Sequence, residues 1–492
     1  MTHILAIDQS TSATKAVLFD AAGTVVGRVS REHQQIYPQP GWVEHDAEEI
    51  WQNLLAAIGD LASRQREKLA EAVGLAITNQ RETFVVFERG TGEPLANAIV
   101  WQCRRGDSIC RELADAGREE IVRRKTGLRL DTYFSGSKLA WLIREHPEIR
   151  ARLASGDALF GTIDTYLVYR LTGGQVFATD PTNASRTLLY DISRLRWDDE
   201  LCQLFHVPMR ALAEVRESFA RFGETDAGGR LPTKLPICGV MGDSQASLFA
   251  QRCYEPGAAK ATFGSGTSVM LNIGDRFTPS DHGSVAALAW VHQGRPTYAL
   301  EGLINYSSAT ISWLRDQLGL VRDAAETDAL ARAVDDNGGV YLVPAFSGLS
   351  APYWSPDARA AIVGMTAHSR KEHIVRAALE AIAYQIRDVL EMMHAEAGVA
   401  PRVLHADGGP TRNDFLMQFT ADIAGVGLDA SEVPESSALG VAMAAMLGLG
   451  HVKSLGELGA LPRTTRLYRP KMGRDQVDRL YAGWKSAVKR VL

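Results

Sequence analysis

The sequence lacks the features that mark several common protein classes. Its five cysteines are scattered and form no C-x-x-C pair, which argues against a disulfide framework and a structural zinc site. A net charge of −5 leaves no basic excess for nucleic acid or an anionic membrane surface. The start of the chain has no signal-peptide pattern, and no apolar run approaches the ~18 residues of a transmembrane helix. We therefore expect a cytoplasmic protein with a small-molecule substrate, no nucleic acid partner and no membrane span.

Three familiar catalytic motifs are missing as well. The sequence contains no G-x-x-x-x-G-K-[ST], no complete G-x-G-x-x-G and no H-E-x-x-H. These absences exclude a Walker-type nucleotide site, a dinucleotide fingerprint and zincin chemistry. If the substrate carries phosphates, short loops with exposed amides, a few cations and a metal must hold them.

The chain has 492 residues, more than the ~250–300 that one hydrophobic core supports. We expect two domains, 1–252 and 253–492, with the boundary near the turn at 254–257. Strands are predicted at 4–7, 15–19, 24–29, 73–78 and 403–407, and helices from 46 onward and at 373–395, 414–423 and 438–447. Their interleaving predicts the α/β class. The hairpin at 4–19 is echoed near 260–273, which suggests two related domains facing one cleft.

Three polar loops follow apolar strands and are suited to phosphate binding. The first is DQSTSATK at 8–15, where Asp8 could hold Mg²⁺ and Lys15 could offset phosphoryl charge. The second is GSGTS at 264–268, whose glycines let the backbone approach a ligand. The third is DGGPTRN at 407–413, which places amides at a helix N-terminus. Each loop alone is also compatible with an ordinary turn, or with Asn413 acting only as a cap.

Asp243 lies between a predicted strand and a predicted helix, in the N-cap position. Its carboxylate could accept the proton of a substrate hydroxyl during phosphoryl transfer, or it could simply cap the helix. Arg81 and Glu82 form a turn that could donate to and accept from vicinal hydroxyls, with a solvated surface pair as the alternative. Trp101 and Tyr133 could wall a substrate site or pack in a core.

Taken together, these stretches resemble the FGGY carbohydrate kinases, and within that family most closely the glycerol kinases. The resemblance rests on DQSTSATKAV, ITNQRET, NAIVWQCRR, TNASRT, GDSQ, PAFSGLSAPYW and DGG followed by NDFLMQF, which occur in order along nearly the whole chain. Residues 133–145 and 360–380 are similar to the two family signatures. The resemblance implies two actin-like, ribonuclease H-like domains around a central cleft that binds Mg-ATP and a polyol or sugar.

The resemblance also implies a role for individual residues. Asp243 would be the general base, and Asp8 and Asp243 would organise Mg²⁺. The predicted ATP-binding residues are Thr11, Ser12, Ala13, Lys15, Ser265, Ser308, Ser312, Gly409 and Asn413. The predicted acceptor-binding residues are Arg81, Glu82, Trp101, Tyr133, Asp243, Ser244 and Ser268. We expect phosphorylation of a terminal hydroxyl of glycerol, giving glycerol 3-phosphate, by a homodimer or homotetramer.

Two departures from the glycerol kinase pattern lie beside the expected acceptor. Ser244 stands where a Gln is usual, and Ser268 where a Phe usually packs on the glycerol carbons. Both changes make the site roomier and more polar, so a kinase for a four- or five-carbon alditol or ketose is the main alternative. The segment GGRLPTKLP replaces the glycine-rich loop used for fructose 1,6-bisphosphate inhibition, which puts that regulation in doubt.

Two further alternatives belong to other classes. The sequence GDSQA at 242–246 is one residue short of the G-x-S-x-G elbow of a serine hydrolase that would use Ser244. An actin-like ATPase without a small acceptor would share the phosphate loops but would leave the Arg81–Glu82 turn and the Tyr133 signature unexplained.

Overall fold

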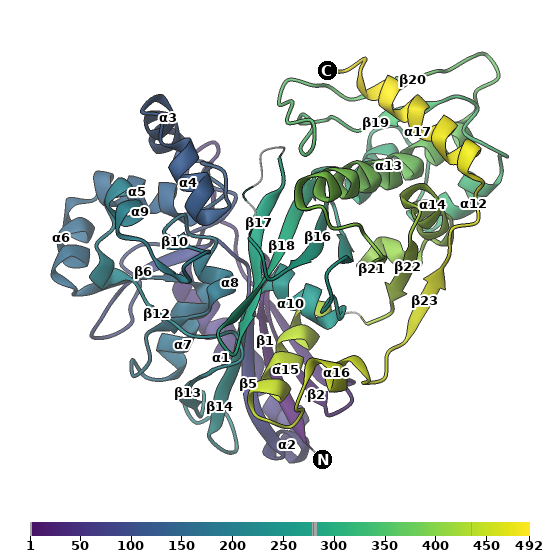
Figure 1. Ribbon diagram of the computed structural model, residues 1–492. Coiled ribbons are helices and arrows are strands. Elements are labelled where there is room, and N and C mark those ends of the chain that lie inside the picture. Colours follow the sequence, from purple (N-terminus) through teal and green to yellow (C-terminus); the bar gives the residue numbers. More distant parts are fainter. Residues whose placement is uncertain (1, 278, 280–282, 434) are drawn as a thin grey trace.

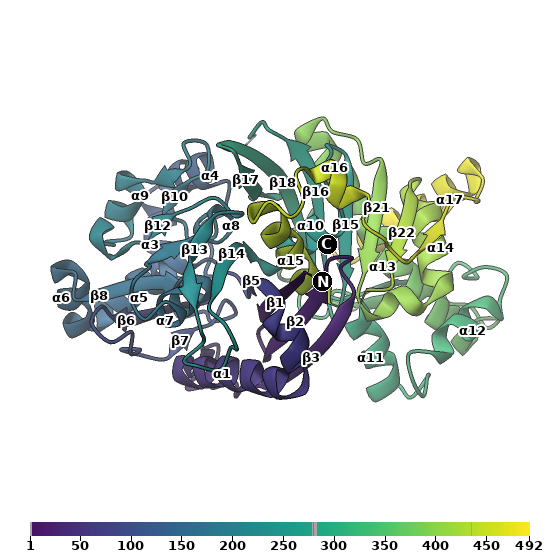
Figure 2. The same cartoon turned by 90° about the horizontal axis from the view of Figure 1, so that it is seen from below.

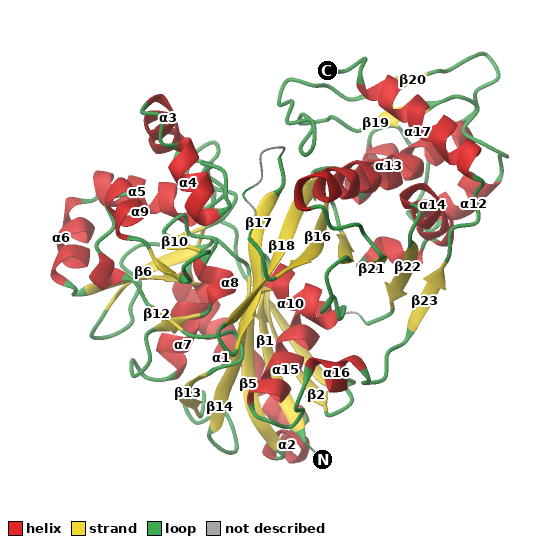
Figure 3. Cartoon of the chain, in the orientation of Figure 1, coloured by secondary structure: helices red, strands yellow, loops and turns green. Residues whose placement is uncertain are grey.

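The computed structural model describes residues 2–277, 279, 283–433 and 435–492, and they form two lobes, each built on one large sheet (Figure 1). The first sheet has the order β13-β14-β5-β1-β2-β3 and the second β17-β18-β16-β15-β21-β22-β23. Strands and helices interleave in both lobes (Figure 3), so the predicted α/β class is confirmed.

The first sheet begins with the predicted hairpin. Strand β1 is buried at every position, as expected for the centre of a two-sided sheet. It pairs antiparallel with β2 and parallel with β5, which continues parallel to β14. The strands are β1 (His3–Gln9), β2 (Ala13–Asp20), β3 (Val25–Glu32), β5 (Ala72–Asn79), β13 (Arg221–Thr225) and β14 (Leu235–Gly242).

The second sheet repeats this plan. Strand β15 pairs antiparallel with β16 and parallel with β21, which continues parallel to β22. The echo between the two hairpins in the sequence therefore reflects two sheets of the same design. The strands are β15 (Ala258–Phe263), β16 (Thr267–Gly274), β17 (Val285–His292), β18 (Arg295–Ile304), β21 (Val403–Asp407), β22 (Gly427–Ser431) and β23 (Thr465–Tyr468).

Two helices lie between the sheets and join the lobes (Figures 1 and 2). Helix α10 (Asp243–Ala250) packs against α15 (Ser436–Gly448), and α15 in turn packs on β1, β5 and β14. The residues of α15 are apolar on all sides, as expected for a helix that is buried all round. A segment near the end of the chain thus lies on the sheet formed by its beginning.

The outer part of the first lobe carries a four-stranded sheet, β4-β7-β6-β8, and most of the shorter helices. Helix α1 packs on β2 and β3, and its N-terminus is capped by Asp46. The elements are β4 (Glu44–His45), β6 (Phe84–Glu88), β7 (Ala98–Ile99), β8 (Ala158–Thr162), β9 (Ala178–Thr179), β10 (Tyr190–Asp191), β11 (Arg196–Trp197), β12 (Glu214–Val215), α1 (Ala47–Arg64), α2 (Arg66–Ala70), α3 (Asp107–Asp115), α4 (Glu119–Thr126), α5 (Ser135–Glu145), α6 (Pro147–Ser155), α7 (Ile163–Leu171), α8 (Pro181–Ala184) and α9 (Asp199–Leu204).

The second lobe is covered by longer helices around α13. The elements are α11 (Ser308–Asp316), α12 (Glu326–Arg332), β19 (Tyr341–Val343), β20 (Ala361–Val363), α13 (Lys371–Ala397), α14 (Asp414–Ala424) and α17 (Arg474–Val488). Helix α16 (Leu455–Gly459) lies beside α15 instead (Figure 1). All five cysteines are free, as expected. Across the described ranges, every helix is either too short or too polar to cross a bilayer.

Candidate active site

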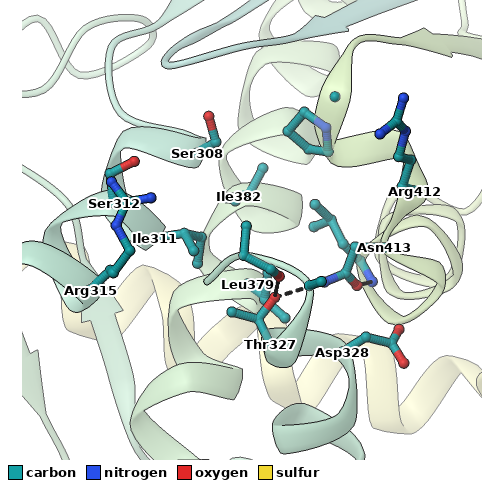
Figure 4. A pocket seen from close by; sticks show the side chains of 15 residues that line it. Ser308, Ile311, Ser312, Arg315, Thr327, Asp328, Leu379, Ile382, Arg412 and Asn413 are labelled. Atoms are coloured by element: carbon teal, nitrogen blue, oxygen red, sulfur yellow. Dashed lines mark hydrogen bonds between the residues drawn. The ribbon is translucent and has the colours of Figure 1, made fainter. Parts of the chain in front are cut away.

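A cavity of about 490 Å³ in the second lobe brings together four of the predicted ATP-binding residues (Figure 4). Ser308 and Ser312 reach it from α11, Gly409 from the third loop and Asn413 from the start of α14. Apolar side chains from α11 and α13 form much of its wall, namely Ile311, Leu379 and Ile382. A mostly apolar cavity of this size with a few polar groups is typical of a small-ligand site.

Asn413 both caps a helix and closes one side of this cavity. Its Oδ1 accepts a hydrogen bond from the backbone N–H of Leu416 at 2.8 Å, and its Nδ2 donates to Thr327 Oγ1 at 3.0 Å. The side chain therefore has a fixed orientation on the cavity wall. The capping role and the predicted ligand role of Asn413 are compatible with each other.

The second polar loop is joined to the start of α11. The backbone N–H groups of Ser308 and Ala309 donate to the carbonyl oxygens of Gly264 and Ser265, each at 3.1 Å. A Cβ at Gly266 would lie 2.4 Å from the carbonyl oxygen of Ile304, so only glycine fits there. The contact brings the predicted residue Ser265 to the same helix that carries Ser308 and Ser312.

A second cavity, of about 520 Å³, continues from the first and shares Gly409 and Arg412 with it. Asp8 and Lys15 line it, and Lys15 Nζ lies 3.0 Å from both Asp8 Oδ2 and Glu435 Oε2. Burial alone would lower the pKa of Lys15, but the two carboxylates outweigh it and hold that pKa above its usual value. Lys15 is therefore a cation that lines this cavity.

Carboxylate oxygens in this cavity fit a magnesium ion that is also bound by a nucleotide. Burial raises the pKa of Asp8, against the opposing effect of Lys15. Asp407 Oδ2 accepts hydrogen bonds from Ser247 and Gln251, whereas its buried Oδ1 has no partner among the described residues. Within those ranges no three His, Cys, Asp or Glu side chains form a metal cluster. Magnesium is usually bound through one or two carboxylates together with waters and substrate phosphates.

Asp243 is the first residue of α10, and Gly242 rather than Asp243 is the N-cap. The capping alternative for Asp243 is therefore wrong, because β14 continues to Gly242 and the helix starts at once. Asp243 Oδ1 accepts from the backbone N–H of Ser244 at 2.6 Å and lies 3.3 Å from Arg81 Nε. The side chain is 35% exposed, so its carboxylate is open to a substrate while held by an arginine.

Arg81 and Glu82 are buried, so the alternative of a solvated surface pair is also wrong. The side chains of Arg81 and Glu82 are 5% and 2% exposed. Glu82 has a backbone φ of 62°, a left-handed conformation that a residue with a Cβ adopts at a cost of order 1 kcal/mol. An ion pair holds it there, with Arg186 Nε 2.5 Å from Glu82 Oε1. Local strain of this kind is typical of functional sites.

Trp101 and Tyr133 form an aromatic pair at the mouth of the cleft. Their ring centroids are 5.4 Å apart in an edge-to-face arrangement. They line an open cavity of about 1060 Å³ to which Asn305 and Ser347 contribute from the second lobe. Trp101 Nε1 donates to Thr11 Oγ1 at 3.0 Å, which ties this aromatic pair to the first polar loop. Both rings also pack against the core of the outer part of the first lobe, so they combine the two roles considered from the sequence.

Several charged residues at the centre of the site were not predicted from the sequence. Glu301 on β18, Arg186 after α8 and Lys260 on β15 are almost fully buried. Ser268, which was predicted, lies beside Glu301, with Oγ donating to Glu301 Oε1 at 3.4 Å. A charged residue within an otherwise apolar strand, as in YALEGLI and AAKATF, could have indicated Glu301 and Lys260. Such a residue is buried with its strand, and a buried charge must be paired.

Comparisons with known proteins agree with this architecture. The N-terminal domain model of the FGGY family of carbohydrate kinases matches residues 3–250, and the C-terminal domain model matches residues 259–449. The chain is 46% identical to a glycerol kinase of Desulfitobacterium hafniense over 490 residues, covering 100% of this chain and 99% of that protein. It is 47% identical to glycerol kinase 1 of Thermotoga maritima, with the same coverage.

A solved structure shows the same fold over the whole chain. The crystal structure of Plasmodium falciparum glycerol kinase with ADP superposes with a TM-score of 0.95 at 36% identity, covering 100% of this chain and 98% of that one. Two sheets of one design, together with this match, define the class of two-lobed, actin-like ATP-dependent kinases. The chain belongs to the FGGY family of carbohydrate kinases.

Proposed function

We propose that this protein transfers the γ-phosphoryl group of ATP to a terminal hydroxyl of glycerol, giving glycerol 3-phosphate and ADP. The observation that carries the proposal is the placement of Asp243 beside a buried Arg81–Glu82 turn, with Arg81 Nε 3.3 Å from Asp243 Oδ1. The relatives named glycerol kinase, at 46% and 47% identity over the whole chain, support glycerol as the acceptor.

The acceptor side of the site supplies orientation and a base. The guanidinium of Arg81 donates and the carboxylate of Glu82 accepts, so together they suit neighbouring hydroxyls of a polyol. Asp243 accepts the proton of the terminal hydroxyl as its oxygen attacks the γ-phosphorus. A new O–P bond forms, the bond to the β–γ bridging oxygen breaks, and ADP leaves with that electron pair.

The nucleotide side holds the donor. Ser308, Ser312, Gly409 and Asn413 surround the cavity proposed for the adenosine, and Lys15 is placed to offset charge on the transferred phosphoryl group. The remaining proposed ATP contacts come from the first two loops, at Thr11, Ser12, Ala13 and Ser265. Bound Mg²⁺ supplies charge neutralisation of the phosphates, and Asp8 and Asp243 are the residues proposed to hold it.

A kinase for a longer polyol is the second candidate. The observation that favours it is the small side chain at Ser268, which lies on β16 beside Glu301 where an aromatic ring would narrow the site. The hydrolase alternative has no such support, since no hydrogen bond between Ser244 and a histidine occurs among the described residues.

A substrate panel tests the proposal. ADP formation is measured with glycerol, erythritol, xylitol and xylulose at saturating Mg-ATP, together with a reaction lacking any acceptor. We expect the highest kcat/KM for glycerol. A tenfold preference for a four- or five-carbon acceptor, about 1.4 kcal/mol of transition-state stabilisation, would transfer the assignment to that acceptor, and acceptor-independent turnover would support an ATPase.

A further inference from the structure

Four buried charges form a network between the two lobes. Arg81, Glu82 and Arg186 belong to the first lobe, and Glu301 reaches them from β18 of the second sheet. Each of the four side chains is at most 5% exposed. Two positive and two negative groups thus compensate one another out of contact with water, as buried charges require.

Glu301 is the member that contacts both arginines. Its Oε1 lies 2.8 Å from Arg81 Nη2, and its Oε2 accepts from Arg81 Nη1 at 3.2 Å, which is the two-pronged geometry of a strong arginine–carboxylate pair. The same Oε2 lies 2.9 Å from Arg186 Nη2. Burial would raise the pKa of Glu301, but the two arginines outweigh burial and lower it to about 2, so the carboxylate stays ionised.

The pairing fixes the orientation of the two groups that face the acceptor. Glu301 binds both Nη atoms of Arg81, and the Nε atom of Arg81 then faces Asp243 at 3.3 Å. Arg186 spans from Glu301 to Glu82, which it meets at 2.5 Å while Glu82 is in its left-handed backbone conformation. Removing the charge of Glu301 would leave two buried guanidinium groups close together without the carboxylate that separates them.

We propose that Glu301 is a positioning residue for the acceptor, which completes the acceptor site of the first lobe from the second lobe by holding Arg81 and Arg186. This inference rests on the proposed kinase function. It adds that acceptor affinity depends on a contact between lobes, whereas the nucleotide cavity, whose lining residues are all between Ser308 and Leu416, does not use this contact.

The test compares Glu301→Gln with Glu301→Asp, using the acceptor that the wild-type enzyme turns over best. Gln keeps the shape of the side chain and loses its charge, whereas Asp keeps the charge and shortens the side chain. We expect Glu301→Gln to raise the acceptor KM at least tenfold, with the KM for ATP within twofold of wild type. Glu301→Asp should raise the acceptor KM less.

A matched control is Asp388→Asn, which removes another buried carboxylate of the second lobe. Asp388 accepts hydrogen bonds from Tyr353, Tyr481 and Trp484 and lies 2.7 Å from Lys485 Nζ. It should lower the melting temperature without changing the acceptor KM. Failure of the wild type to phosphorylate any polyol would overturn the proposed function itself, which separates that outcome from the role of Glu301.

Two results would overturn the positioning role. One is a Glu301→Gln enzyme whose acceptor KM stays within twofold of wild type. The other is a smaller rise in acceptor KM for Glu301→Gln than for Glu301→Asp. A packing role predicts this order, because Gln keeps the shape of the side chain and Asp does not. If Glu301→Gln does not fold, Arg186→Lys carries the test, because lysine cannot bridge Glu82 and Glu301 and should also raise the acceptor KM at least tenfold.

Discussion

Replacing Asp243 with asparagine separates chemistry from binding at this site. Asparagine keeps the size of the side chain and an Oδ1 that can still accept from the Ser244 N–H. The contact with Arg81 Nε at 3.3 Å weakens, but the Asp243 side chain is 35% exposed, so solvent screening limits this loss to under about 1 kcal/mol of stability. The fold should therefore survive the substitution.

The expected loss is in the chemical step. A positioned general base contributes about 10²- to 10⁴-fold to the rate, which corresponds to about 3–5 kcal/mol on the activation barrier. We expect kcat to fall by at least 10²-fold. Asp243 does not line the cavity that Ser308, Ser312 and Asn413 form, so the Kd for ATP measured without Mg²⁺ should stay within about twofold of wild type.

The assay follows ADP release with acceptor and Mg-ATP both saturating, with ATP binding measured by calorimetry. Asp198→Asn is the control, because Asp198 is a buried carboxylate that caps α9 and pairs with Lys125 at 2.6 Å, away from the cleft. A tenfold rise in Mg²⁺ that restored kcat would assign the effect to metal binding. A kcat within tenfold of wild type would refute the role of Asp243 as base.

Three further changes test separate parts of the site. Asn413→Ala removes a helix cap, so it should cost about 1 kcal/mol of stability, and it should also raise the KM for ATP. The control Ser454→Ala removes the cap of α16 and should lower stability alone. Equal ATP KM values for the two variants would contradict the assignment of Asn413 to the ATP site. Ser268→Phe should lower kcat/KM for a pentitol at least tenfold relative to glycerol, and an unchanged ratio would show that residue 268 does not limit acceptor length. Because the pKa of Glu301 is lowered to about 2, its ion pairs stabilise the fold fully above about pH 4.5 and less as the pH falls towards 2, a contribution on the order of 3 kcal/mol. The free energy of unfolding of Glu301→Gln, measured with denaturant, should therefore depend less on pH in that window than that of the wild type. Parallel pH curves for the two proteins would contradict this prediction.

The local features of the fold could be predicted from the sequence because they depend on neighbouring residues. The strand predicted at 403–407 is β21 (Val403–Asp407), and the helix predicted at 414–423 is α14 (Asp414–Ala424), capped by Asn413. A short apolar run followed by a glycine-rich turn and a capping residue specifies both elements. Asp8 and Lys15 were both assigned to the first polar loop, and the antiparallel hairpin places them opposite each other.

The long-range features could not be predicted in this way. Glu301 and Arg81 are 220 positions apart, and no periodicity along the chain relates them. The backbone φ of 62° at Glu82 is imposed by Arg186 and its surroundings rather than by local preference, since glutamate gains nothing from that conformation. The sequence likewise indicated a helix at 438–447, but it did not show that this helix would lie on the sheet formed by the start of the chain.

The position of that helix explains how the proposed base can stay fixed while the substrate varies. Asp243 begins α10, Glu435 precedes α15, and the two helices pack together between the sheets, with Ser437 Oγ donating to the carbonyl oxygen of Asp243 at 3.0 Å. The proposed base and the carboxylate that holds Lys15 are thus anchored to one rigid pair of helices. The groups proposed to select the acceptor, Trp101, Tyr133 and Ser268, lie on other elements. A substitution such as Ser268→Phe can therefore change which acceptor size the site admits without moving Asp243, because it leaves the α10–α15 contact intact.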